Sequence, residues 1–516
     1  MCGILLHYAP DQGTKQGLVD EYVEYGECPV TTDKKSKTSD IFEQIVPYIK
    51  ARGPDYCSFR SLREHCTAWF SSVLSLRDPF TSQSVDIDGR YILQFNGELY
   101  NAEVQNNDTQ FIVSKLLAPE ADVYQIVQSL QGEFSYTIYD LKKHKFFFGR
   151  DNVGKRSLGY RLCRESGELY VSSVSGAIDG FVDCAAGAIY VYDPATKSLD
   201  HSFELTSPYT VSPAVDHELT GLDCAVTQLY DVLDLAVRKR VRSIHPIHIE
   251  NSPIGILFSG GLDCTVIAAL VCRQLQQCSM TRKVVELINV GFENPRTGIM
   301  PADTPDRKLA SSSARFLKRQ YPDIDIRLIE VDVPYEEYLQ QRDTVIDLMY
   351  PKDTEMDLSI AIAFYFASRG AGKLRSSAGE TVAYQRQAIV LFSGLGADEL
   401  YGGYHKLANK SLAELQQELS RQINNIHDRN LNRDDKVIAI NGVEVRYPFL
   451  DHDVIQFSTQ ELPISYKINK LALRKLASDK LALDGICDEP KRAIQFGTKS
   501  AKMTKDGNKH GTDRLK

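Results

Sequence analysis

Hydrophobic and polar positions follow two different patterns along this 516-residue chain. In the first part, short runs of aromatic and β-branched residues are separated by turn residues, which is typical of β-strands. On this pattern we expect strands at residues 90–100, 133–140, 144–151 and 168–174. Residues 31–40, TTDKKSKTSD, contain no core-forming side chain and are predicted to be a loop.

From residue 218 onward, helical periodicity alternates with short apolar runs. Residues 219–243 place their apolar side chains on one helical face and have Lys and Arg near their end, which favour a helix C-terminus. A second helix is expected at residues 264–276. Buried strands are expected at residues 252–258, 284–292, 324–331 and 387–394, with helical stretches between them. Alternating strands and helices predict a parallel α/β sheet.

The change of pattern falls in residues 205–217, which contain two prolines and little periodicity. A chain of this length is too long for one core, so we expect two domains, at 1–210 and 218–516. Within the second domain, residues 376–387 are predicted to be a polar loop. The basic tail after Lys499 is predicted to be a solvated, frayed end.

Composition excludes several classes of protein. The formal net charge of −8 argues against nucleic acid as the main partner, because binding to nucleic acid needs clustered Lys and Arg. The eleven cysteines are scattered and odd in number, which favours a reducing compartment and no structural zinc. No signal peptide and no apolar run long enough to cross a membrane is found. We therefore expect a cytoplasmic protein with no membrane partner.

The first candidate site begins at the N-terminus, with MCGI. Removal of the initiator Met would place the thiol and the α-amino group on Cys2 itself. The amine has a pKa of roughly 8, so its neutral form can take the thiol proton. This is the N-terminal-nucleophile arrangement.

Three further motifs supply groups that would recognise glutamine. Arg52, in RGPD, offers a guanidinium fork for a carboxylate. Asn96 and Gly97, in NGELYN, offer two donors for an oxyanion. Asp108 offers a carboxylate for an ammonium group. Each motif alone is more often a turn or a surface charge. Together, however, they would bind a carboxylate, an amide carbonyl and an amine, which are the groups of glutamine.

The second candidate site consists of two small-residue loops that each follow a predicted strand. SGGLDCT, residues 259–265, lies before a helix, where glycine N–H groups and a helix N-terminus favour phosphate. Asp263 could hold Mg²⁺ bridging phosphates. SGLGADE, residues 393–399, gives a second loop with a carboxylate, and Lys491 could supply the cation that both loops lack. The ends of parallel strands are where such sheets bind ligands.

Eight motifs then occur in the order seen in glutamine-dependent asparagine synthetases, which the chain resembles over nearly its whole length. They are MCGI, RGPD, NGELYN, GRDNVGKRSLGY, SGGLD, SGLGADE, GGY and VEVRYPFLD. NDTQ, SGLGADE and FASRG are most similar to the branch called asparagine synthetase domain-containing proteins.

The resemblance implies two domains and two half-reactions. The first domain would be a class II glutamine amidotransferase, an αββα sandwich of the N-terminal-nucleophile hydrolases, in which Cys2 attacks glutamine. The second would be an ATP-pyrophosphatase α/β domain, related to adenine nucleotide α-hydrolases, in which ammonia from glutamine meets an aspartate activated by ATP. The positions that match the glutamine and oxyanion site are Arg52, Asn96, Gly97, Glu98 and Asp108. The positions that match the ATP site are Leu257, Ser259, Gly260, Gly261, Asp263, Val290, Ser393, Gly394 and Lys491, with Asp263 and Asp398 at the Mg²⁺–pyrophosphate positions.

The chain also departs from the family pattern. Leu395 stands where the family has a Glu that is thought to move protons when ammonia attacks, and Ser359 stands where an Arg shapes the aspartate pocket. Cys264 and Ser157 replace a Ser and a Pro. Three interpretations remain open: an enzyme that makes asparagine, an amidotransferase with another acceptor, and a non-enzymatic binding protein. The oligomeric state and the protein partners are left open by the sequence.

Overall fold

The computed structural model describes residues 2–10, 16–26, 34–202, 208–216, 219–245, 248, 252–279, 282–375, 379–404, 407, 410–503 and 510–515. The chain forms two compact units. The first contains residues 1–207 together with 346–352 and 427–443, and the second contains residues 208–345, 353–426 and 444–516. The first boundary lies within the proline-containing stretch that the sequence indicates. The two later segments of the first unit are not part of the domain 1–210 that the sequence predicts.

Two antiparallel sheets form the centre of the first unit. One has the strand order β11-β9-β10-β1-β4-β3-β2, and the other has the order β13-β12-β8-β7-β6-β5. The strands of the first sheet are β1 (Cys2–Tyr8), β2 (Glu21–Tyr25), β3 (Tyr56–Leu62), β4 (Thr67–Val73), β9 (Gly159–Cys163), β10 (Glu168–Ser172) and β11 (Val182–Asp183). Those of the second are β5 (Val85–Ile87), β6 (Tyr91–Leu99), β7 (Gly132–Asp140), β8 (Lys145–Arg150), β12 (Ile189–Asp193) and β13 (Ser198–Ser202).

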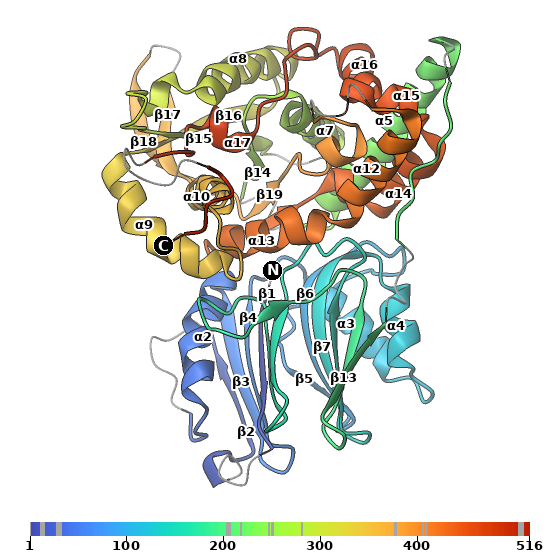
Figure 1. Cartoon of the computed structure of the whole chain (residues 1–516), viewed down its shortest axis with the longest axis vertical. Coiled ribbons are helices and arrows are strands. Elements are labelled where there is room, and N and C mark those ends of the chain that lie inside the picture. Colours follow the sequence, from blue (N-terminus) through green and yellow to red (C-terminus); the bar gives the residue numbers. More distant parts are fainter. Residues whose placement is uncertain are drawn as a thin grey trace. The chain divides into compact units, whose positions relative to one another are not determined.

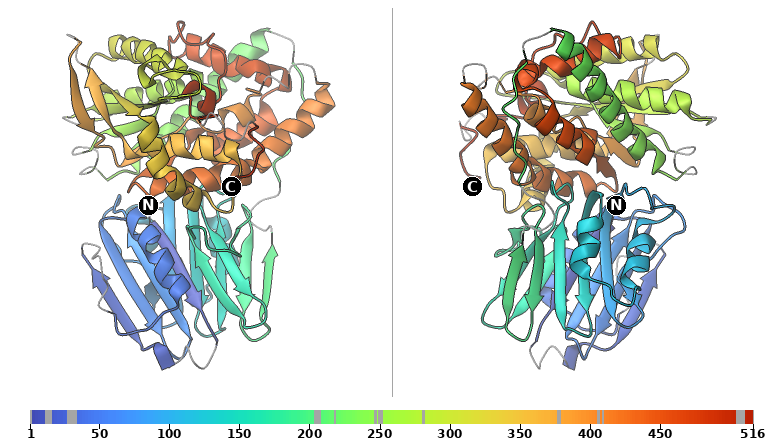
Figure 2. Two further views of the ribbon diagram at one scale, coloured as in Figure 1. Left: turned by 60° about the vertical axis from the view of Figure 1, so that its left-hand side comes forward. Right: turned by 90° about the vertical axis from the view of Figure 1, so that its right-hand side faces the viewer.

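Helices cover the outer faces of these sheets. Helix α2 (Asp40–Arg52) packs against β1 and β4, whereas α3 (Asp108–Leu116) packs against β6 and α4 (Val123–Ser129) against α3 (Figure 1). Between the sheets lies an aromatic core that includes Trp69, Tyr139 and Phe148. The two sheets lie face to face in the views of Figure 2. The expected αββα sandwich is thus the observed fold of this unit.

The second unit contains the predicted α/β sheet, in the order β18-β17-β16-β15-β14-β19-β20. Its parallel strands are β14 (Ile254–Leu257), β15 (Val284–Phe292), β16 (Asp325–Val333), β19 (Val390–Phe392) and β20 (Glu444–Arg446). The larger helices are α5 (Leu219–Arg242), α7 (Leu262–Gln277), α8 (Pro305–Gln320), α9 (Tyr335–Met349), α10 (Glu355–Arg369), α12 (Leu412–Asn424) and α16 (Leu471–Asp479). Because β14 lies between β15 and β19, the loops that follow β14 and β19 are neighbours at one edge of the sheet.

Two local predictions are wrong. Residues 381–385 are not loop: they form β18 (Thr381–Gln385), which pairs antiparallel with β17 (Ala371–Arg375). The Thr, Val and Tyr of this short segment suit a strand, and β17, only a few residues earlier in the chain, supplies its partner. The tail is not frayed at residues 510–515, since the amides of Glu355 and Leu515 donate to the carbonyls of Asp513 and Asp353. The predicted loop 31–40 lies partly outside the described residues, and its last residue, Asp40, begins α2.

The hydropathy of the helices and the state of the cysteines bear on the predictions of no membrane span and of a reducing compartment. Within the described part of the chain, no helix is both long and apolar enough to cross a membrane. Nine of the described cysteines are free thiols, and Cys57 is disulfide-bonded.

Candidate functional site

Cys2, the predicted nucleophile, is the first residue of β1, a strand in the middle of its sheet. Its nitrogen donates to Oδ1 of Asn96, 2.8 Å away. Asn96 lies fully buried on β6, and its Nδ2 is 3.5 Å from the hydroxyl of Ser135. The structure therefore holds the future α-amine of Cys2 beside the amide predicted to bind an oxyanion.

A pocket in the first unit joins Cys2 to most of the other predicted glutamine residues. It is lined by Cys2, Val73, Leu74, Ser75, Leu76, Arg77, Phe80, Thr81, Gln83, Phe95, Gly97, Glu98, Asn107, Asp108 and Thr109. Gly97 has φ +150°, and a Cβ there would lie 2.0 Å from the carbonyl oxygen of Glu133. Only glycine fits, so its backbone can line the pocket where a side chain would collide.

Arg77 supplies the guanidinium of this pocket. Its Nε lies 2.9 Å from Oε2 of Glu98 and 3.1 Å from Oδ2 of Asp108, and its Nη2 donates to the carbonyl of Leu99 at 2.7 Å. Asp108 begins α3, and its other oxygen accepts the amide N–H of Leu99 at 3.0 Å. A cation and an anion thus lie side by side near Cys2, as binding of an amino acid's carboxylate and ammonium groups requires.

Arg52, which the sequence offers as the carboxylate partner, does not line this pocket. It lies at the end of α2, where its side chain is fully buried and its Nη2 is 2.9 Å from Oδ2 of Asp435. Asp435 belongs to α13 (Asn432–Ala439), which lies in the later segment 427–443 of the first unit. The same oxygen accepts the amide N–H of Ser157 at 2.9 Å and its hydroxyl at 2.6 Å.

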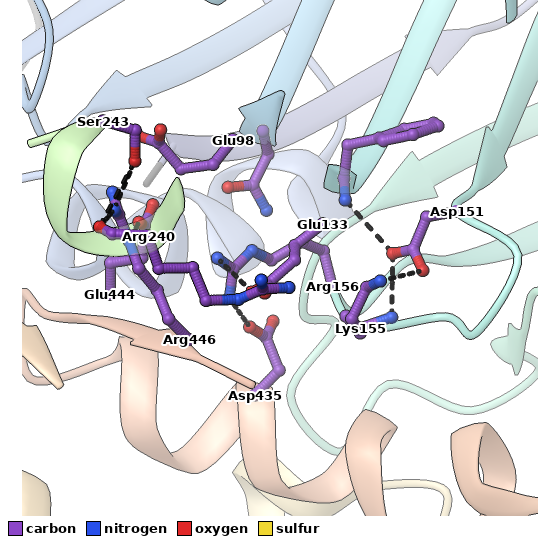
Figure 3. A network of polar contacts seen from close by, with 12 residues as sticks. Glu98, Glu133, Asp151, Lys155, Arg156, Arg240, Ser243, Asp435, Glu444 and Arg446 are labelled. Carbon is purple, nitrogen blue, oxygen red and sulfur yellow. Dashed lines mark hydrogen bonds and ion pairs between the residues drawn. The ribbon is translucent and has the colours of Figure 1, made fainter. Parts of the chain in front are cut away.

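Asp435 is part of a larger buried charge network in the first unit (Figure 3). Arg156 approaches Asp435 at 3.7 Å and Glu133 at 3.4 Å, and none of these three side chains is exposed. Burial alone would raise the pKa of Asp435, but Arg52 and Arg156 hold it below its ordinary value. Arg52 is therefore bound within this network, where the sequence expected it to face a ligand.

In the second unit, the two small-residue loops lie side by side, as predicted. Ser259 to Gly261 follow β14, and Ser393 to Gly396 follow β19, its parallel neighbour. Gly260 has φ +84°, and a Cβ there would lie 2.4 Å from the amide nitrogen of Ala310. Helix α7 begins after Gly261, and no side chain caps its N-terminus, as an anion site at a helix N-terminus requires.

The carboxylates of these loops converge on one lysine. Nζ of Lys470 lies 2.7 and 2.6 Å from the two oxygens of Asp263, and 2.6 Å from Oδ1 of Asp398. Lys491 contacts the other oxygen of Asp398 and lies 4.7 Å from the ring centre of Tyr404. Burial lowers the pKa of Lys491, and the charge of Asp263 opposes that shift.

This donor set fits a magnesium–phosphate group. Two carboxylates that share one cationic position are ligands that Mg²⁺ uses together with phosphate oxygens. Asp263 and Asp398 would hold the ion, which would neutralise phosphate charge, and the two lysines would face the phosphates. Among the described residues, no group of three or more His, Cys, Asp or Glu side chains is arranged to hold a metal without such an outside ligand.

The remaining predicted positions lie around these loops. Leu257 and Val290 are buried on β14 and β15. The Cys264 thiol, beside Ser259, is buried, which raises its pKa. Leu395 is half-buried, and its amide N–H donates to the hydroxyl of Ser393 at 3.2 Å.

Ser359 lies on α10, which packs against β15. Its hydroxyl donates to the carbonyl of Met356 at 2.8 Å. The structure thus accounts for this hydroxyl within its own helix.

Two residues at these sites were missed from the sequence. Arg77, in SLRDPF, belongs to no charge pattern that separates it from other arginines, although its place shortly after an apolar strand is a weak signal. Lys470 precedes the regular helix α16 and has a left-handed backbone, φ 61°. Neither property of Lys470 can be inferred from the residues alone.

Comparison with known proteins supports both halves. The Asparagine synthase family model matches residues 228–414 and 407–515, and the Glutamine amidotransferase domain model matches residues 27–188. An asparagine synthetase domain-containing protein of Saccharomyces cerevisiae is 59% identical, covering 100% of this chain and 99% of the relative. Asparagine synthetase domain-containing protein 1 of Bos taurus is 28% identical over 93% of this chain and 96% of its own length. The asparagine synthetase [glutamine-hydrolyzing] of Cricetulus griseus is 26% identical over 88% and 81%, respectively. The chain belongs to the asparagine synthetase family, with a glutamine amidotransferase domain joined to an asparagine synthase domain.

Proposed function

We propose that this protein is a glutamine-hydrolysing, ATP-dependent amidotransferase that transfers glutamine's amide nitrogen to an activated carboxylate. The observation that carries the proposal is the contact of 2.8 Å between the Cys2 nitrogen and Asn96 in a pocket that also holds Arg77 and Asp108. A cytoplasmic location is part of the proposal.

The first half-reaction takes place at Cys2. After removal of Met1, the α-amine takes the thiol proton, and the sulfur attacks the amide carbon of glutamine. Asn96 Nδ2 and the Gly97 N–H would stabilise the oxyanion. The C–N bond breaks, ammonia leaves with the proton from the amine, and water then hydrolyses the thioester to glutamate. Arg77 and Asp108 would hold the carboxylate and the ammonium group of the substrate.

The second half-reaction takes place at the loops after β14 and β19. A carboxylate oxygen attacks the α-phosphorus of ATP, and pyrophosphate leaves from an acyl adenylate. Ammonia attacks the acyl carbon, which releases AMP and forms an amide. Asp263, Asp398, Lys470 and Lys491 would hold Mg²⁺ and the leaving pyrophosphate. By resemblance to the family, the acceptor would be aspartate.

A second candidate function is an amidotransferase with a different acceptor, or a protein that binds these ligands without turnover. The observation that favours it is Leu395. Its hydrocarbon side chain occupies the loop position where the family has a proton-transferring Glu, and it can neither accept nor donate a proton.

The test is a steady-state assay of glutamate, asparagine and pyrophosphate with purified protein, compared with Cys2→Ala. The proposal expects glutamate release that Cys2→Ala abolishes. When ammonia is supplied directly, the ATP-dependent half-reaction should still proceed in Cys2→Ala. Pyrophosphate without asparagine, appearing only when another carboxylate is added, would favour the second candidate. Glutaminase activity equal to wild type in Cys2→Ala would refute the assignment of the nucleophile.

A further inference from the structure

The backbone that carries Lys470 is in an unusual conformation. Asn469 (φ 53°) and Lys470 (φ 61°) are consecutive left-handed residues, and neither is glycine. Such pairs are disfavoured for residues with a Cβ, and they persist where surrounding contacts hold them. The amide N–H of Lys470 donates to the carbonyl of Tyr401 at 3.0 Å. The side chain is only 4% exposed, and its ammonium group faces Asp263 and Asp398.

One guanidinium contacts the carbonyl of this strained turn. Arg474, on the first turns of α16, donates through Nε to the carbonyl of Asn469 at 2.8 Å. Its Nη1 donates to the carbonyl of Glu489 at 3.1 Å and also to that of Cys487. Glu489 lies two residues before Lys491. Arg474 thus joins the two chain segments whose lysines meet at Asp398.

Two flexible side chains gain little from being near a ligand unless their backbones are fixed. Lysine has a long, flexible stem with four rotatable bonds, so the position of its ammonium group depends on where its backbone is held. The contacts from Arg474 to the carbonyls of Asn469, Cys487 and Glu489 are called the bracket below. Arginine suits this role because its planar guanidinium can donate to several carbonyls at once. A purely structural role would satisfy the same carbonyls, but it would not require that both bonded segments end in lysines directed at one carboxylate.

We propose that Arg474 is a positioning residue that holds Lys470 and Lys491 together on the phosphates of ATP. The inference rests on the proposed function only for the identity of the ligand. The bracket itself is a property of the chain without nucleotide.

The first test measures the lysines directly. Arg474→Met keeps the aliphatic stem and removes the fork, and Arg474→Lys keeps one donor and the charge. Arg273→Met is the matched control, because Arg273 donates to the carbonyl of Lys480, just after the other end of α16. Acetylation by N-hydroxysuccinimidyl acetate, followed by mass spectrometry, should proceed several-fold faster at both Lys470 and Lys491 in Arg474→Met. Lys475, on the same helix, should label at the wild-type rate in every variant.

The second test measures Mg²⁺-ATP binding by calorimetry. Misplaced binding groups cost large factors, so Arg474→Met should weaken affinity roughly tenfold, with Arg474→Lys between it and wild type. In a Lys470→Met background, Arg474→Met should add less than it does alone, because one of its two targets is already absent.

The outcomes separate the bracket from the nucleotide. Unchanged labelling of Lys470 and Lys491 in Arg474→Met overturns the bracket. Faster labelling with wild-type ATP affinity overturns its role in positioning the lysines. Faster labelling when even the wild type fails to bind Mg²⁺-ATP supports the bracket and refutes the proposed nucleotide function. Equal acceleration in Arg273→Met would show a general loosening of α16 and would also overturn the proposal.

Discussion

Arg77→Met should abolish recognition of the glutamine carboxylate, whereas Arg52→Met should not. Both arginines are buried or nearly so, but only Arg77 lines the pocket that contains Cys2. Removing one partner of a desolvated charge pair costs roughly 2–5 kcal/mol, or about 30-fold to several-thousand-fold in kcat/KM. The expected loss lies in this range because the Arg77 side chain is only 10% exposed.

Loss of Arg77 would also leave Glu98 and Asp108 facing one another, so some lost activity could reflect unfolding. A ratio of two substrates measured on the same variant removes that ambiguity. The assay compares kcat/KM for glutamine with that for 4-aminobutanamide, which keeps the amine and the amide but lacks the carboxylate. Wild type should prefer glutamine by the factor above, and Arg77→Met should show nearly equal values. Arg77→Lys should fall between them, because it keeps the charge without the fork.

Arg52→Met is the matched control. It leaves Asp435 with Ser157 and Arg156 but without its closest guanidinium. Breaking a buried pair costs about 3–5 kcal/mol of stability, so its melting temperature should fall while the substrate ratio stays at the wild-type value. The reasoning is refuted if Arg77→Met keeps the wild-type ratio, or if Arg52→Met collapses it.

Three further predictions concern the second unit. Asp263→Asn should weaken Mg²⁺-ATP binding, measured by calorimetry, because it removes a carboxylate that faces Lys470; equal affinity would remove Asp263 from the metal role. Lys467→Met should raise the free energy of unfolding by on the order of 3 kcal/mol near neutral pH. Burial lowers the pKa of Lys467 to about 7, which costs about 4 kcal/mol relative to the unfolded chain, and about 1 kcal/mol of this gain is lost with the hydrogen bond that Nζ donates to the Leu462 carbonyl. The unfolded chain binds the extra proton between about pH 7 and about pH 10, so wild-type stability rises over this window and the gain in the variant should shrink there in urea titrations; a gain that grows with pH contradicts the sign. Leu395→Glu should raise asparagine formation over wild type without reaching the glutaminase rate, because Ser359 is also changed, and no change would remove Leu395 from the limiting step.

Much of the fold follows from periodicity because burial dictates it. The strand expected at 284–292 is β15, and the helix expected at 219–243 is α5, Leu219–Arg242. Both have long apolar patterns that suit only one element type. The segment 381–385 failed this logic because it is largely exposed and has no buried face to set a pattern, although its Thr, Val and Tyr suit the strand that it forms with β17. Likewise, residues 510–515 are ordered by backbone bonds to residues 353–356, which no local pattern encodes.

The candidate sites divide along a similar line. Cys2, Asn96, Gly97 and Asp108 stay predicted site residues; each lies in a motif whose chemistry is local, and the structure places Cys2, Gly97 and Asp108 around one pocket, with Asn96 bonded to Cys2. Whether Arg52 or Arg77 reaches the pocket that contains Cys2 could not be predicted, because both arginines are ion-paired and only their folded positions differ. Arg77, paired with Glu98 and Asp108, lines that pocket, whereas Arg52 is paired with Asp435 outside it. Sequence reasoning identifies which groups suit a ligand, but the tertiary fold decides which of them line the pocket.

The change at Leu395 bears on only one of the two half-reactions. The pocket that contains Cys2 is lined by residues of β1, β6, α3 and the segment after β4, all in the first unit, and no residue of the loop after β19 lines it. The groups proposed to bind the phosphates, Asp263, Asp398 and the two lysines, do not include Leu395. In the proposed reaction, a leucine at that position would leave no proton acceptor at the last step, when ammonia has attacked the acyl carbon and the new amide nitrogen must lose a proton. Loss of such a group costs about 10²- to 10⁴-fold in rate, whereas the proposed glutamine hydrolysis and ATP binding would not depend on it. The sequence change thus predicts uncoupling: glutamate formed in excess over amide product.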